Sequence, residues 1–142
     1  MSRYFPHAAY AEDQPLARTI LTIHVLARGF TAGAGGSRNI RPLRSAQLLR
    51  STGTASAVGL GLMGIALAGR MWGRDDIEWR DRAWRLMTNQ GQLETDDWTY
   101  GGAVAGLFAS AAMPRMRAVG GWGTVAGSAG LGSVVGTVGY LV

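Results

Sequence analysis

Long apolar blocks separated by short charged stretches divide the chain. Residues 51–69 and 118–142 contain no Asp, Glu, Lys or Arg. An uncharged apolar stretch of about 20 residues is long enough to cross a membrane as a helix. Residues 99–113 form a shorter block, which as a helix would be about 22 Å long and would need help from flanking Trp and Arg side chains to span. These blocks predict an all-α membrane protein.

A fourth apolar block, residues 16–36, differs because it contains Arg18, His24 and Arg28. Charges within a span are costly and often functional. His24 and Arg28 are four residues apart and share a helix face, so two interpretations remain open. They form a proton-relay pair facing a wet groove, or the helix is tilted or interfacial and its arginines meet lipid phosphate or a partner's carboxylate.

The pattern therefore predicts an N-terminal tail, 1–15, and one helical membrane domain, 16–142. That domain has three to four glycine-rich transmembrane helices and a short interfacial amphipathic helix. The candidate spans are 16–36, 51–69, 99–113 and 118–142, and an acidic Trp/Arg loop covers 72–98.

Small residues recur at every fourth position in three of these blocks. In a soluble helix each glycine costs roughly 1 kcal/mol relative to alanine. In a membrane the same residues let two helix backbones approach closely. We therefore expect the helices to pack along these rows. The predicted packing residues are Gly53, Ala57, Gly61, Gly102, Gly106, Gly120, Thr124, Ser128, Gly132 and Gly136.

The acidic stretch is unusual in its composition. Residues 75–98 hold seven of the nine acidic residues and three of the five tryptophans. Acid–arginine pairs spaced four apart predict a helix over 76–87, with Ile77 and Trp84 on its membrane face and an end near Asn89. The pairs are Asp76–Arg80, Glu78–Arg82 and Asp81–Arg85. We expect the stretch to be a docking surface for a basic partner or simply a solvated loop. The predicted docking residues are Glu78, Trp79, Asp81, Trp84, Asp96, Asp97 and Trp98.

The basic residues, all 14 of them arginine, concentrate elsewhere. The connections after the first and third apolar blocks carry arginines and no acid, and in a four-span chain these two connections share a side. The positive-inside rule places them toward the cytoplasm or the mitochondrial matrix, with the acidic stretch opposite. Their expected ligand is anionic phospholipid such as cardiolipin. The predicted headgroup contacts are Arg38, Arg41, Arg44, Arg50, Arg115 and Arg117.

Little in the chain indicates catalysis. With no cysteine and two histidines, a metal or redox centre built by this chain alone is not expected. Gly59, Gly61 and Gly64 match a dinucleotide-type spacing, but inside an apolar run that lacks the strand the motif requires. The arginines flank apolar runs and are not interleaved with stacking aromatics, which disfavours nucleic acid. We expect no catalytic residue, cofactor, metal or small-molecule substrate.

The segments IEWRDRAWRL (77–86) and GQLETDDW (91–98), followed by a glycine-rich span, resemble a small fungal family. Its members are accessory subunits of mitochondrial respiratory complex I (NADH:ubiquinone oxidoreductase) known as NUXM. The resemblance implies a non-catalytic, multi-pass inner-membrane subunit of the respiratory chain that contacts other membrane-arm subunits. It also implies arginine loops in the matrix and the acidic loop in the intermembrane space.

A second resemblance is to the Tim17/Tim22/Tim23 group, which also has four short glycine-rich spans. That group's arginine- and aspartate-bearing signature near the second and third spans is not clearly present here. This resemblance implies the alternative function, a component of a membrane translocase or a small channel.

Overall fold

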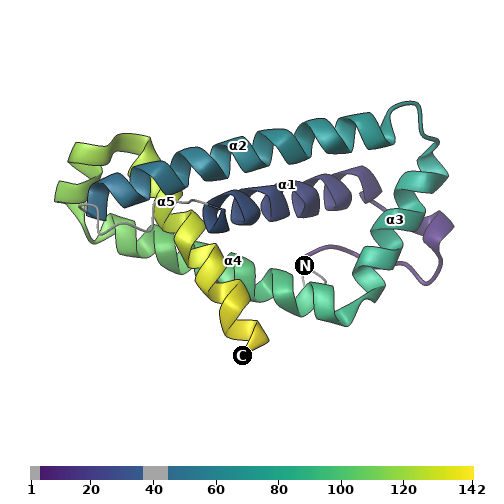
Figure 1. Ribbon diagram of the computed structural model, residues 1–142. Coiled ribbons are helices and arrows are strands. Elements are labelled where there is room, and N and C mark those ends of the chain that lie inside the picture. The colour runs from purple at the N-terminus through teal and green to yellow at the C-terminus, as the bar shows by residue number, and fades with distance from the viewer. Residues whose placement is uncertain (1–3, 37–44) are drawn as a thin grey trace.

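The computed structural model describes residues 4–36 and 45–142, and in these residues it contains helices and no strand (Figure 1). The all-helical prediction is confirmed. The elements are the 3₁₀-helix η1 (Ala11–Asp13) and the α-helices α1 (Ala17–Gly35), α2 (Ser45–Met71), α3 (Asp76–Thr88), α4 (Gln90–Ala111) and α5 (Pro114–Leu141).

Two of these helices are long and apolar enough to cross a membrane. They are the part of α2 from Ala46 to Met71 and the part of α5 from Gly120 to Leu141. The helix α4, which corresponds to the predicted span 99–113, begins at Gln90 and not near residue 99. The Asn89 side chain accepts a hydrogen bond from the backbone N–H of Gln92 and so caps this earlier start.

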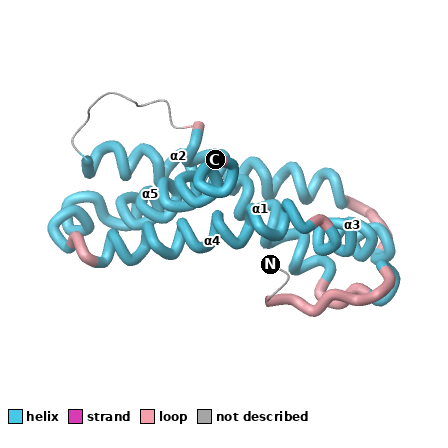
Figure 2. The backbone as a smooth tube through the Cα atoms, turned by 90° about the horizontal axis from the view of Figure 1, so that it is seen from below, coloured by secondary structure: helices cyan, strands magenta, loops and turns pink. Residues whose placement is uncertain are grey.

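Four helices lie alongside one another and reverse direction at each step along the chain, while α3 crosses one end of the bundle (Figure 1). The view from below shows the same arrangement (Figure 2). The end of α1 at Gly36, the start of α2 at Ser45 and the turn between α4 and α5 therefore lie at the end opposite α3. This places the two ends of the first arginine-rich connection near the second such connection.

The helices α4 and α5 pack backbone against backbone. A Cβ added to Gly102 would collide with the carbonyl oxygen of Gly132, and one added to Gly106 would collide with that of Ser128. Gly136 meets the carbonyl group of Trp98 in the same way. Only glycine allows this approach, so the predicted residues Gly102, Gly106, Ser128, Gly132 and Gly136 lie at the contact of the two helices. Gly120, at the start of the predicted row on α5, lies beside Arg50 of α2 instead.

The prediction is wrong for two residues of α2. Ala57 is exposed, and a Cβ on Gly61 would meet no atom within 4 Å. The third predicted residue of α2, Gly53, does pack, on α5 at Gly123. The contact with α1 is made by Gly59, which packs on Gly29. The reason is geometric: a row with a spacing of four drifts about 40° per step around a helix. One such row cannot follow two partner helices on different sides.

The helix α3 covers the end of α1. Its inner face, which includes Trp79, Ala83 and Met87, packs against Ala17 and Ile20. The predicted membrane face is wrong in part, because Trp84 is half-buried against the N-terminal segment. Ile77, at the start of the helix, is exposed.

Of the three predicted ion pairs in α3, Asp81–Arg85 is present, with an N–O distance of 3.0 Å. The other two predicted pairs are wrong. Asp76 pairs with Arg18 because α3 packs on α1. Glu78 pairs with Arg74 in the connection that precedes the helix.

Candidate functional site

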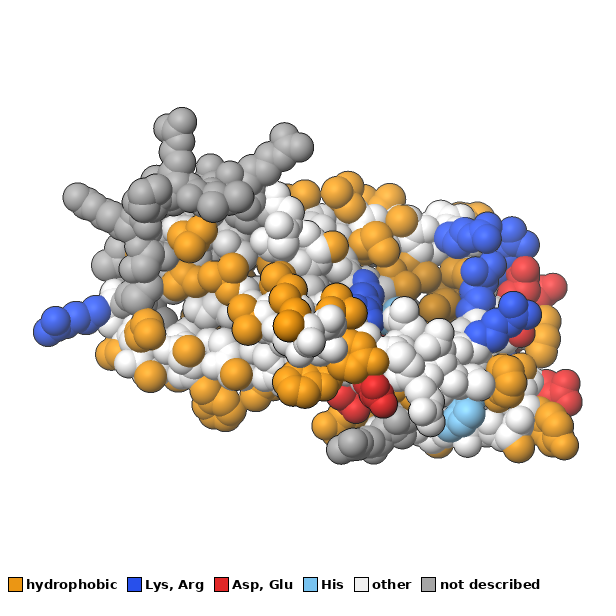
Figure 3. Space-filling view, turned by 60° about the horizontal axis from the view of Figure 1, so that its bottom comes forward, with side chains coloured by type: hydrophobic (Ala, Val, Ile, Leu, Met, Phe, Trp, Pro, Cys, Tyr) orange, Lys and Arg blue, Asp and Glu red, His pale blue; other side chains and the backbone are white. Residues whose placement is uncertain are grey.

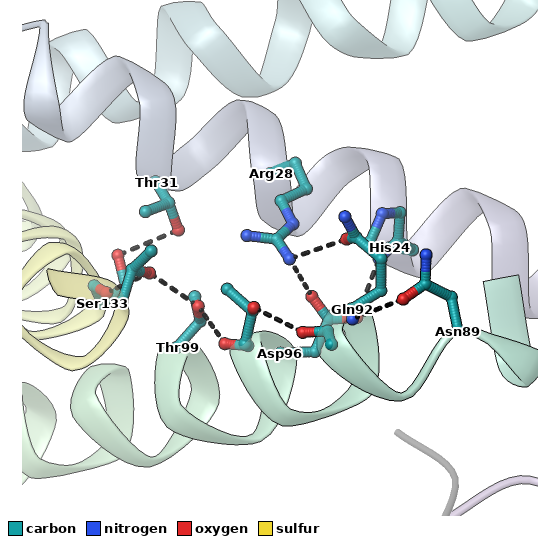
Figure 4. A network of polar contacts seen from close by, with 11 residues as sticks. His24, Arg28, Thr31, Asn89, Gln92, Asp96, Thr99 and Ser133 are labelled. Atoms are coloured by element: carbon teal, nitrogen blue, oxygen red, sulfur yellow. Dashed lines mark hydrogen bonds and ion pairs between the residues drawn. The ribbon is translucent and has the colours of Figure 1, made fainter. Parts of the chain in front are cut away.

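The charged residues of α1 face a carboxylate on α4 (Figure 4). His24 Nδ1 lies 2.8 Å from Asp96 Oδ2, and the Arg28 guanidinium lies 2.9 Å from Asp96 Oδ1. Each carboxylate oxygen therefore has one nitrogen partner. The backbone of α1 lies closer to α2 and α5 than to α4, so these long side chains bridge the space between α1 and α4.

Burial makes this cluster energetically important. The Asp96 side chain is 2% exposed, that of His24 13% and that of Arg28 26%. A buried carboxylate without a partner is costly, and removing one member of such a pair typically costs several kcal/mol. The cluster corrects the expectation that Asp96 belongs to a docking surface: it is buried and neutralised within its own chain.

Two polar residues near the start of α4 extend the cluster. Gln92 Oε1 accepts a hydrogen bond of 3.0 Å from Arg28, while the backbone N–H of Gln92 donates to the Asn89 cap. The cap positions the first turn of α4 and with it the amide that orients the guanidinium. The ion pair and the helix start therefore form one connected unit.

Hydroxyl groups continue the polar contacts further along the bundle (Figure 4). The Thr99 and Thr137 hydroxyl oxygens are 2.7 Å apart and join α4 to α5. The Thr31 hydroxyl donates to Ser133 Oγ at 3.0 Å and joins α1 to α5. Together with the ion pair, these bonds connect three helices through polar side chains. We name this set the polar network; its members are His24, Arg28, Thr31, Gln92, Asp96, Thr99, Ser133 and Thr137.

Three further buried hydroxyl groups lie between α2 and α5 beyond the network. Thr52 and Ser56 are fully buried, and Thr124 is 1% exposed. None of the three hydroxyls has a hydrogen-bond partner within the described part of the chain. Ser56 lies beside Gly130, since a Cβ there would come within 2.6 Å of its oxygen. Hydroxyl groups therefore continue from the network toward the end opposite α3.

Neither interpretation of His24 and Arg28 included the partner that the structure gives them, which is a carboxylate of the same chain. Arg28 and Asp96 bring one positive and one negative charge to the cluster, and His24 Nδ1 lies within hydrogen-bond distance of the same carboxylate. Such a buried polar cluster holds two helices together across an apolar interior. In residues 4–36 and 45–142, no three His, Asp or Glu side chains converge as metal ligands.

Sequence reasoning missed the role of Asp96, although a signal existed. His24 and Arg28 are four residues apart, and so are Gln92 and Asp96. Two polar pairs with the same helical spacing can face each other across two packed helices. The predicted start of the third span at residue 99 placed Asp96 in a loop and concealed the match.

Some of the predicted docking residues form contacts within the chain's own fold, and the others remain at or near the surface. Trp79 lies under the Arg18 guanidinium, 5.6 Å from the ring centre. Trp84 Nε1 donates to the Ala8 carbonyl group, and its ring stacks on His7. These two tryptophans stabilise the chain's own fold, which corrects the expectation that they dock a partner.

Four of the predicted docking residues remain at or near the surface. Trp98 is 55% exposed. Glu78 and Asp81 stay partly accessible although both form ion pairs. Asp97 is half-buried.

The predicted headgroup arginines are described in part. Arg50 and Arg115 are exposed at the end opposite α3, and the Arg50 stem lies against Gly120 and Gly123 of α5. Arg38, Arg41 and Arg44 lie outside the described residues, as does the side chain of Arg117.

Comparison with known proteins identifies no relative: no protein-family model, curated protein or solved structure matches this chain.

Proposed function

We propose that the chain is a non-catalytic accessory subunit of mitochondrial complex I, embedded in the inner membrane and packed against the membrane arm. The observation that carries the proposal is the distribution of charge. Inside the bundle, Arg28 and His24 are matched by Asp96, while the long helices carry apolar side chains outward. This is the construction of a structural membrane element.

The outward surface supports a membrane location. Large apolar side chains are exposed along α2, α4 and α5, and hydrophobic side chains cover the middle of the face in Figure 3. Most of the charged side chains on that face lie at the end that carries α3. In water so many exposed large apolar side chains would be unfavourable. The exposed residues include Val58, Leu62, Ile65, Leu107, Phe108, Trp122 and Val135.

The dimensions fit a bilayer. Arg50 and Arg70 bracket a stretch of α2 without charge, which as a helix is about 28 Å long. A hydrocarbon core is about 30 Å thick. Trp72 is exposed just beyond the α3 end of α2, and Trp122 is exposed near the other end of the bundle, as expected for aromatic belts. We therefore propose that α2, α4 and α5 span, that α1 enters with its polar side inward, and that α3 lies at the interface.

The choice of complex I rests on the resemblance in residues 77–86 and 91–98. The proposed orientation and the proposed partners follow from the same resemblance. The arginine-rich end lies in the matrix, and α3 lies in the intermembrane space. Other membrane-arm subunits would contact Trp98 and the accessible acids of α3, and cardiolipin would contact the arginine-rich end.

The test is a native gel of mildly solubilised membranes that contain the tagged chain, stained in the gel for NADH dehydrogenase activity. We expect the tag in the high-mass active band, where it should remain after a second detergent wash. A Trp98→Ala variant should weaken this association, whereas Trp122→Ala, at the other end, serves as the matched control. A tag that runs alone or with import machinery would contradict the proposal.

A second candidate function, a translocase component or small channel, is favoured by one observation. Buried hydroxyl groups continue from the polar network to Thr52 and Thr124. A polar path through a membrane bundle is a common feature of transport proteins. Ion flux through liposomes that contain only the purified chain tests it. Flux that is lost in Ser56→Ala would favour this function, and liposomes that remain impermeable would exclude it.

A further inference from the structure

A groove follows the contact between α1 and α2 on the surface of the bundle. Near α3 it begins as a hollow of about 380 Å³, with Leu21 and Val25 on one side and Leu67 on the other. Further along it widens to about 840 Å³ between Gly33 and Val58. Met63 lines both hollows, so they adjoin each other along α1 and α2, and we name the two together the groove.

The antiparallel pairing of α1 and α2 explains why the two hollows of the groove lie in line. Gly29 contacts Gly59, and Gly33 contacts Ala55. On both helices the lining residues follow one row spaced three or four apart, so they stay on one side of the pair. The opposite side of α2 faces α5 through Gly53. The groove therefore opens outward, where Val58 and Leu62 are 56% and 62% exposed.

The end of the groove near α3 is cationic, because it is lined by Arg70 of α2 and Arg82 of α3. The other arginines at this end are engaged. Arg18, Arg74 and Arg85 pair with carboxylates, and Arg80 donates to the Glu12 carbonyl group. Arg70 and Arg82 form no ion pair with any described residue. Arg70 and Arg82, which form neither an ion pair nor a side-chain hydrogen bond with any described residue, thus line the same hollow.

We propose that this groove binds one anionic phospholipid from the leaflet on the α3 side. The phosphate would lie between Arg70 and Arg82, which can donate to its oxygens. One acyl chain would lie along Leu67 and Met63 as far as Gly59. That part of the groove is about 16 Å long on α2, which matches one leaflet of a hydrocarbon core about 30 Å thick.

The charge at the mouth favours a lipid over an apolar helix of another subunit. A helix in the groove would leave two guanidinium groups without an anion at its end, whereas a phospholipid supplies the anion and the apolar chain together. The inference depends on the membrane location in the proposed function. It does not depend on membership of complex I.

The test uses the purified full-length chain in mild detergent, with native mass spectrometry to count bound lipid. Phosphatidylglycerol and phosphatidylcholine with the same acyl chains are supplied in equal amounts. We expect one retained phosphatidylglycerol and at least about a tenfold preference over phosphatidylcholine, which corresponds to about 1.4 kcal/mol. Equal retention of the two lipids would overturn the proposal.

Two pairs of variants locate the site. Arg70→Gln with Arg82→Gln should reduce phosphatidylglycerol retention at least fivefold, whereas Arg74→Gln with Arg85→Gln, at the same end, should change it less than twofold. Ala66→Phe fills the hollow and should also abolish retention. Ala68→Phe adds the same ring to α2 outside the groove and should not. Circular dichroism establishes that each variant is folded.

The remaining outcomes also decide the question. If inorganic phosphate displaces the lipid at millimolar concentration, the site recognises an anion alone and the lipid proposal is wrong. It is equally wrong if the charge variants bind lipid normally but detach the chain from a partner protein, because the groove then holds a helix. Lipid retention without migration in the active complex I band would contradict only the proposed function.

Discussion

The contact between α4 and α5 and the contact between α1 and α4 hold the bundle together in opposite ways. Along α4 and α5, Gly102 and Gly132 bring two backbones into direct contact. Between α1 and α4 the backbones stay apart, and Arg28 and His24 reach across to Asp96. The first contact depends on side chains that are absent, and the second depends on long side chains and their charges.

The difference shows that the two contacts have different tolerances. A backbone contact fails when any atom is added, because the neighbouring backbone cannot move aside. A charged bridge fails when its charges no longer balance, even if its shape is kept. Substitutions that separate volume from charge therefore distinguish the two contacts.

The largest effect is expected for Gly102→Ala. Its new Cβ would collide with the Gly132 carbonyl group, and overpacking a tight contact costs about 3 kcal/mol or more when the backbone cannot relax. The matched control is Gly101→Ala, where a Cβ meets nothing within 4 Å. Denaturant unfolding in detergent micelles should show a large loss for Gly102→Ala and none for the control. Equal stability of both variants would mean that α4 and α5 are not packed this closely.

The next effect is expected for Asp96→Asn, which keeps the shape and removes the charge. It leaves Arg28 without its carboxylate, and breaking a buried pair in this way costs about 3 kcal/mol. Asp81→Asn removes one charge from an exposed pair and should cost less than about 0.5 kcal/mol. The same unfolding measurement compares them.

Balance of charge is tested by replacing all three members of the cluster, His24, Arg28 and Asp96, with leucine. We expect this triple variant to be more stable than Asp96→Asn, because it leaves no buried charge without a partner. Replacing only His24 and Arg28 with leucine should destabilise the fold, since it leaves the buried Asp96 carboxylate without a partner. A double variant as stable as the unmodified chain would show that Asp96 has no need of these partners.

A smaller effect is expected at the start of α4. Asn89→Ala removes the cap on the Gln92 N–H group and should cost about 1 kcal/mol. Gln90→Ala, at the first helical position, is the control and should be nearly neutral. Hydrogen exchange of the first turn of α4 is the readout, because fraying there should precede global unfolding. Unchanged protection of Gln92 would argue against the cap.

The smallest effect is expected for Thr99→Val. It removes the hydroxyl contact with Thr137, whose own hydroxyl lies 2.9 Å from the Ser133 carbonyl oxygen and can still donate to it. Hydrogen bonds between membrane helices average about 0.6 kcal/mol in double-mutant cycles. A cycle with Thr137→Val should give a coupling of that size. A coupling near zero would place the two hydroxyls out of contact.

The sequence by itself determined the helical class and much of the element plan. The uncharged apolar block 51–69 lies within one long helix, and 118–142 is helical on both sides of a kink at Gly121. Both are helical because an apolar chain must satisfy its backbone hydrogen bonds locally. The acid–arginine spacing located α3, and Asn89 marked its end. The small residues of α4 and those of α5 from Ser128 to Gly136 also revealed the contact of these two helices, because over this length each row faces one partner.

Only the tertiary structure decided which side chains are neutralised and which remain available. The partner of Arg28 lies 68 positions away in the chain, at Asp96, and no local periodicity connects them. Likewise, Trp79 and Trp84 are used within the fold, while Arg70 and Arg82 are left without a carboxylate beside a groove. Charge pairing depends on which helices meet and at what register. Both are set by packing across the whole bundle, so no segment by itself can specify them.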